Sequence, residues 1–138
     1  MSKVVSMRLK PQVWQRLGAM ARRLGRTPSE TSALLVDEAL RSAEFAFVQF
    51  RDSPVGRQAY VIGTSLAVWE VAFLACFFEG DAERVADHLG WPTTKVRAAL
   101  NYAAAYPDEV ASAIRDNEAG PDALRRALPG LEDVLVEP

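Results

Sequence analysis

Residues 4–30 read VVSMRLKPQVWQRLGAMARRLGRTPSE, and within them the apolar spacing changes from every second residue to every third or fourth. Up to Lys10, apolar side chains alternate with polar and basic ones, as on a β-strand with one buried face. Helical sequence begins at Pro11, before any second strand, and a lone strand cannot pair its own backbone groups. The partner strand is therefore expected to come from a second copy of the chain.

Two helices are predicted directly after this strand. The first runs from about Pro11 to Leu24, and Gly25 is its left-handed stop. The second starts near Thr27, where the residues TPSE form a capping box, and reaches the mid-forties. We expect a dimer core made of Val5, Met7, Leu9, Val13, Leu17, Leu34 and Leu35.

Residues 3 to about 44 resemble the ribbon-helix-helix superfamily of bacterial repressors and antitoxins. The resemblance rests on the alternating strand, the apolar anchors Leu9 and Val13, and the turn of residues 25–27 placed twelve residues beyond Val13. It implies a dimer that reads double-stranded operator DNA, with higher oligomers possible on DNA. The expected base contacts are Val4, Ser6 and Arg8, and the expected phosphate contacts are Lys3, Lys10, Arg26, Thr27 and Ser29.

These implied roles agree with the chemistry of the residues. A two-stranded ribbon fits the major groove, Arg8 can donate two hydrogen bonds to guanine, and Ser6 can bond several bases. The start of the second helix offers unpaired N–H groups to a phosphate. Val4 can make only apolar contacts, such as with a thymine methyl, and Pro28 removes one N–H from the phosphate site.

The net charge differs between residues 1–44 and residues 45–138. The whole chain has a net charge of −2, but residues 1–44 carry eight basic and four acidic residues, a net charge of +4. Residues 45–138 carry eight basic and fourteen acidic residues, a net charge of −6. The basic end contains the strand, as phosphate binding requires.

The second module is predicted to begin with a small hairpin, Phe45 to Arg51 and Gln58 to Ile62, and to continue with helices from Leu66, after Asp81 and from Thr93 or Thr94. A further helix is expected from Asp108 to Ile114. The stripe Trp69, Phe73, Phe77 is expected in the core.

The predicted fold is mainly α with short β: a ribbon-helix-helix domain (1–45), a hairpin with a tri-helical, helix-turn-helix-like domain (46–115), and a C-terminal tail (116–138).

Residues 81–101 form the helix-turn-helix-like segment. Its exposed face would show Thr93, Thr94, Lys95, Arg97 and Asn101. Since only two of these are basic and the segment also holds Asp81, Glu83 and Asp87, protein binding or packing is favoured over a second DNA reader.

Residues 47–106 also resemble the small antitoxin-like family known as domain of unknown function 433. The residues that carry this resemblance are Gly56, the run 60–68, the run 81–85 and the run 96–103, although Ser65 and Ala59 stand where the family usually has arginine and proline. The resemblance implies the antitoxin half of a toxin-antitoxin pair with a PIN-like nuclease toxin. The tail either contacts that partner, packs on its own domain or stays mobile. The expected partner contacts are Leu124, Arg125, Arg126, Leu128 and Leu131.

Other function classes are poorly supported by the sequence. Cys76 is the only cysteine and is expected to be an inert core thiol, while the single histidine, His88, is expected in a surface or capping role. The most hydrophobic run is too short to span a membrane. We therefore expect a cytoplasmic repressor and antitoxin with no catalytic residues, metal or cofactor. The alternative is a stand-alone regulator whose second module oligomerises or senses a ligand.

Overall fold

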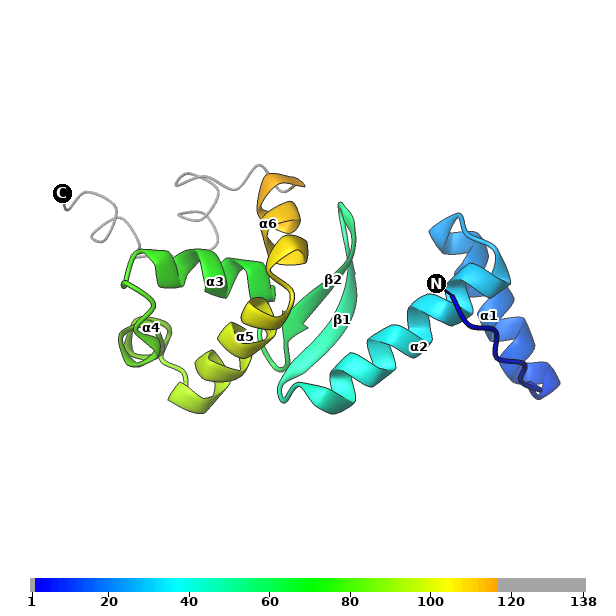
Figure 1. The fold of residues 1–138 in the computed structure, drawn as a ribbon, viewed down its shortest axis with the longest axis horizontal. Coiled ribbons are helices and arrows are strands. Elements are labelled where there is room, and N and C mark those ends of the chain that lie inside the picture. The colour runs from blue at the N-terminus through cyan, green and yellow to red at the C-terminus, as the bar shows by residue number, and fades with distance from the viewer. Residues whose placement is uncertain (1, 117–138) are drawn as a thin grey trace. The chain divides into compact units, whose positions relative to one another are not determined.

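The computed structural model describes residues 2–116, which form six helices and one two-stranded antiparallel sheet (Figure 1). The described protein is therefore mainly helical, as the sequence predicts. The chain divides into a first unit, Met1–Leu40, and a second unit, Arg41–Pro138, with the division inside the second helix. The elements are α1 (Pro11–Leu24), α2 (Pro28–Glu44), β1 (Val48–Ser53), β2 (Gly56–Val61), α3 (Val68–Cys76), α4 (Ala82–Leu89), α5 (Thr93–Ala105) and α6 (Pro107–Asp116).

Helices α1 and α2 begin and end close to the positions that the sequence predicts. Gly25 follows α1 with a φ of 66°, and its N–H donates to carbonyls of the last turn. The Thr27 hydroxyl accepts from the Glu30 N–H at 3.1 Å, and the Glu30 carboxylate accepts from the Thr27 N–H at 3.4 Å. The capping box is thus confirmed, and α2 starts at Pro28 immediately after it.

Residues 2–10 form neither helix nor strand within the single chain. At the end of this segment, Lys10 has extended backbone, with φ and ψ of −62° and 150°. A strand is defined by hydrogen bonds to a neighbouring strand about 5 Å away. Because the expected neighbour is a second copy of the chain, the strand remains a prediction.

The second unit begins with the predicted hairpin. Strands β1 and β2 pair in the register Val48↔Val61 to Ser53↔Gly56, so only Pro54 and Val55 lie between them. The strands therefore extend further toward the turn than the predicted ends at Arg51 and Gln58, and the Ser53 hydroxyl donates to the Gly56 carbonyl at 2.7 Å. Gly56 itself has a φ of 114°, which favours glycine.

The core of the second unit is built by the hairpin and by α3, α4, α5 and α6 (Figure 1). Helix α3 buries one face completely, and the aromatic stripe expected in the core is only half-buried beside it. The stripe thus packs against the core without being enclosed by it, and Phe73 and Phe77 pack edge to face with centroids 5.5 Å apart. The buried residues of this region are Val68, Val71, Leu74, Ala75 and Phe78.

Two further expectations for this unit were also wrong. Cys76 is exposed, not a core thiol, because it lies in the last turn of α3, beyond the buried face. Neither Thr93 nor Thr94 caps α5, because Pro92 occupies the N-cap position with extended backbone and Thr93 is already helical. The helix expected from Leu66 begins two residues later, at Val68. The predicted start after Asp81 is confirmed, because Asp81 caps α4 by accepting from the N–H groups of residues 83 and 84, and Gly90 ends this helix with a φ of 71°.

None of the helices in the described part of the chain has the length and apolar character that a bilayer crossing requires. Residues 2–116 likewise contain no group of three or more histidine, cysteine, aspartate or glutamate side chains that could hold a metal ion.

Candidate nucleic-acid interface

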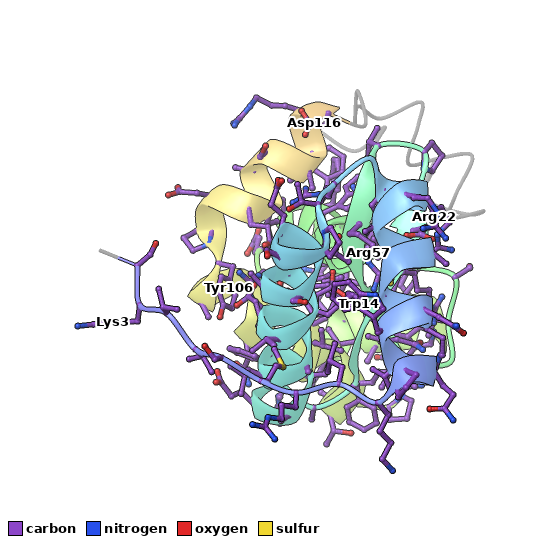
Figure 2. The ribbon with its side chains drawn as sticks, turned by 90° about the vertical axis from the view of Figure 1, so that its right-hand side faces the viewer. Lys3, Trp14, Arg22, Arg57, Tyr106 and Asp116 are labelled. Atoms are coloured by element: carbon purple, nitrogen blue, oxygen red, sulfur yellow. The ribbon has the colours of Figure 1, made fainter. Side chains whose placement is uncertain are left out.

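The expected base-contact residues lie on the extended N-terminal segment, and their side chains are exposed. Val4 is 93% exposed, and Ser6 and Arg8 are exposed as well. Lys3 points outward from the same segment (Figure 2). Ser6, Arg8 and Lys10 therefore present polar and basic groups to solvent at every second position.

The alternate positions of this segment carry apolar side chains that the single chain leaves uncovered. Val5 is 81% exposed and Met7 is 55% exposed, although both were expected in a core. Of the expected dimer core, only Leu17 is buried in one chain, while Val13 remains 39% exposed. The remaining members, Leu9, Leu34 and Leu35, are half-buried.

Two hollows mark the same apolar face. Their volumes are about 560 and 380 Å³. Trp14 on α1 lines the larger hollow and is 57% exposed (Figure 2). Sequence reasoning missed Trp14, although its position three residues before Leu17 places both on one side of a helix. The residues shared by both hollows are Met7, Leu9, Leu17, Ser32 and Val36.

The first unit carries a strong positive charge. It holds seven basic and three acidic residues, a net charge of +4. Six of the seven basic residues precede or lie on α1, among them the exposed Arg22 (Figure 2), and Arg26 lies in the turn after it. All the basic residues that we expected at phosphates, namely Lys3, Lys10 and Arg26, are exposed.

The expected phosphate site at the start of α2 is partly occupied by the protein itself. Thr27 uses its N–H and its hydroxyl oxygen in the capping box with Glu30, whose carboxylate carries the same charge as a phosphate. Pro28 has no N–H to offer. The Thr27 hydroxyl proton and the exposed Ser29 remain available as donors to a phosphate. The negative charge of Glu30 would repel a phosphate bound there.

In the second unit, the helix-turn-helix-like face is less open than the sequence predicts. Thr94, Arg97 and Asn101 are exposed, whereas Lys95 is half-buried with its Nζ 5.8 Å from the ring centroids of both Phe47 and Trp91. Arg97 lies 3.8 Å from the Glu83 carboxylate. This face therefore offers few unengaged cations to a nucleic acid.

A polar cluster that sequence reasoning missed links the end of α2 to α5 and α6. Arg41 Nη1 lies 2.6 Å from the Glu109 carboxylate and donates to the Tyr102 hydroxyl at 2.8 Å; the guanidinium also lies 3.9 Å from the Tyr106 ring centroid. Burial, with a hydrogen bond donated to Glu109, raises the pKa of Tyr102 above its usual value. Since Arg41 and Glu109 are 68 residues apart, no local signal could have joined them.

A small pocket of about 220 Å³ lies beside this cluster in the second unit. The indole Nε1 of Trp69 is buried and has no hydrogen-bond partner among the described residues. Both polar and apolar side chains line the pocket. Its lining includes Phe50, Trp69, Tyr102, Glu109 and Val110.

Comparisons of the chain with protein-family models, with curated proteins and with solved structures find no match. Neither resemblance inferred from the sequence is thus tested by them. The residues expected to bind a partner, Leu124, Arg125, Arg126, Leu128 and Leu131, lie outside the described residues.

Proposed function

We propose that the protein is a dimeric, sequence-specific DNA-binding repressor of the ribbon-helix-helix kind. The observation that carries the proposal is the uncovered apolar face of the first unit, where Val5 and Met7 are 81% and 55% exposed on an extended segment. Full burial of such a side chain stabilises a protein by about 1.5–3 kcal/mol. Pairing of two copies would cover this face and satisfy the backbone of both strands.

In such a ribbon, the base-reading side chains are those opposite the apolar ones. Ser6 and Arg8 alternate with Val5 and Met7, so they face away from the dimer core. Arg8 has the two parallel donors that match guanine, and Ser6 can donate or accept. Val4 would contribute an apolar contact with a thymine methyl group.

The phosphate contacts follow from the charge of the same unit. Lys3, Lys10 and Arg26 are exposed, and the unit has a net charge of +4. The affinity for DNA should therefore fall steeply as the salt concentration rises. The Thr27 hydroxyl and Ser29 would add hydrogen bonds at the start of α2, weakened by the nearby Glu30 carboxylate.

Fluorescence anisotropy with a labelled duplex from upstream of the coding sequence tests this function. Arg8→Ala should weaken binding by about 100-fold in the dimer, because each bidentate guanine contact contributes about 1–3 kcal/mol. Ser6→Ala should weaken it less. Arg97→Ala, which removes an exposed arginine of the second unit, is the matched control. Unchanged affinity of the Arg8 variant would refute the ribbon assignment.

We further propose that the second unit and residues 116–138 bind a protein partner, a PIN-like nuclease toxin, so that the repressor acts as an antitoxin and controls its own operon. Support comes from the implied resemblance and from the helix-turn-helix-like face, which offers few unengaged cations to DNA. Co-expression with the product of the adjacent gene should give co-purification and rescue of growth. Failure of both would remove the antitoxin role and leave the DNA-binding role standing.

The pocket of about 220 Å³ favours a second candidate, a regulator whose second unit senses a small ligand. The buried Trp69 Nε1–H is a donor that a ligand oxygen could satisfy. A thermal-shift screen of small metabolites tests this function. A stabilising compound whose effect is lost in Trp69→Phe would support it, and no shift with any compound would count against it.

A further inference from the structure

A separate exposed apolar surface lies at the base of the hairpin in the second unit. Phe47 precedes β1 and is 40% exposed, while Ile62 follows β2 and is 46% exposed. The two are adjacent because the Ile62 N–H donates to the Phe47 carbonyl at 2.8 Å. Lys95 lies 5.8 Å from the rings of Phe47 and Trp91 and so joins these residues. We name this surface the Phe47 patch: Phe47, Ile62, Trp91 and Lys95.

Phe47 lies on backbone that aromatic residues rarely adopt. Its φ is 61°, in the left-handed region, where glycine and asparagine are favoured. The strained backbone places a large apolar ring partly in solvent and not in the core. Such strain persists where surrounding structure holds it, and it gathers at contact sites.

The Phe47 patch combines its apolar surface with positive charge. Lys95 pairs with no carboxylate among the described residues. Helix α5, from which it comes, carries Lys95 and Arg97 and no acidic residue. The surface therefore matches a segment that combines aliphatic side chains with carboxylates.

The chain itself contains such a segment. Residues 131–138 read LEDVLVEP, with three acidic and four aliphatic side chains, whereas the preceding residues 121–130 contain two arginines and one acid. We propose that residues 131–138 dock on the Phe47 patch of their own chain, with aliphatic side chains against Phe47 and Ile62 and a carboxylate beside Lys95. The docked segment covers an apolar surface that would otherwise face solvent.

The intervening chain is long enough for this contact. Residues 117–130 separate the end of α6 from Leu131, and an extended chain of that length spans up to about 50 Å. A compact unit the size of residues 41–116 has a radius of gyration of roughly 11 Å. Residues 131–138 can therefore reach any face of the second unit. The docking is independent of DNA binding, and a partner protein that binds residues 116–138 would compete with it.

Zero-length cross-linking of the full chain with a carbodiimide tests the docking. The sequence contains three lysines, Lys3, Lys10 and Lys95, so the products are few. Mass spectrometry should find Lys95 joined to Glu132, Asp133 or Glu137. In a mixture of ¹⁴N- and ¹⁵N-labelled protein, the linked peptides should carry one isotope only. Absence of these products, or links between differently labelled chains, would overturn the proposal.

Variants separate docking from folding. Phe47→Asn suits the left-handed backbone, so the fold should be retained while the cross-link yield falls at least tenfold. Val55→Asn changes an exposed apolar residue at the other end of the hairpin and should leave the yield unchanged. Circular dichroism checks that both variants fold. A Phe47→Asn protein that is folded and cross-links like the unchanged chain would exclude the patch as the docking surface.

Discussion

The two units differ in how far one chain can close a hydrophobic core. In the second unit, fifteen buried apolar residues between Val48 and Val110 form one continuous cluster. In the first unit, only Leu17 and Ala21 are buried apolar residues, and Val5, Met7 and Trp14 remain more than half exposed. About 40 residues rarely bury enough surface to be stable alone. The comparison teaches that one chain closes the apolar core of the second unit but leaves much of the apolar surface of the first unit uncovered.

The largest effect on stability is expected in the buried core of the second unit. Leu74 is fully buried in α3, so Leu74→Ala should lower the free energy of unfolding of the second unit by about 2–5 kcal/mol. Leu40→Ala removes the same atoms from a side chain that is 56% exposed in the single chain. Urea titrations of both variants, at a concentration where the protein is monomeric, measure the difference. Equal losses would break the contrast between the units.

The next effect concerns the uncovered apolar face of the first unit. Val5→Asp should raise the dissociation constant of the dimer by at least 100-fold, because it would place a carboxylate in the proposed interface. Val4→Asp places the same charge on the opposite side of the extended segment and should leave the dimer intact. Sedimentation equilibrium distinguishes the two. If both variants dissociate alike, the two faces of the segment do not have separate roles.

A smaller effect is expected in the polar cluster at the end of α2. Tyr102→Phe removes a fully buried hydroxyl that accepts from Arg41 and donates to Glu109, so the free energy of unfolding should fall by about 1–2 kcal/mol. Tyr60→Phe, on the half-buried β2, is the matched control. Chemical denaturation compares them. If Tyr102→Phe loses less unfolding free energy than Tyr60→Phe does, the polar cluster contributes little stability.

The capping box of α2 gives a test in which DNA binding should improve. Glu30→Gln keeps the acceptor for the Thr27 N–H but removes a negative charge from the proposed phosphate site. The affinity for DNA should rise by about two- to five-fold, and the helix content should not change. Asp37→Asn, also on α2 but away from its first turn, serves as the control in the same anisotropy assay.

The smallest effect is a pH dependence in the second unit. Burial raises the pKa of Glu70 above 4.5, although the hydrogen bond from the Ala67 N–H opposes the shift. The carboxyl group of Glu70 thus holds its proton more tightly in the folded state than in the unfolded state. The stability that this difference contributes is complete below the pKa of the unfolded state and is lost as the pH rises through the pKa of the folded state. The free energy of unfolding of the Glu70→Gln variant, relative to that of the unchanged protein, should therefore rise from pH 4 to pH 7. The rise should be about a few tenths of a kcal/mol, because the group is partly solvated. Urea titrations at both pH values measure this gain.

Elements with local signals could be predicted from the sequence alone. Gly25, Asp81, Gly90 and the Thr27 capping box each act through hydrogen bonds within about four residues. The end of α1, the start of α2 and both ends of α4 therefore follow from adjacent residues. The alternation of residues 4–10 also predicts a polar and an apolar face without any tertiary information, and this strand stays a prediction.

Only the tertiary structure decided which side chains the second unit encloses. A helix as apolar as α3 has several faces that could be buried, and the choice of the Val68, Val71, Leu74 face depends on what the hairpin, α5 and α6 present to it. The same dependence left Cys76 exposed and joined Arg41 to Glu109 across 68 residues. Local sequence determines where an element begins and ends, because those interactions span a single turn; burial is a property of the neighbours that the fold brings together.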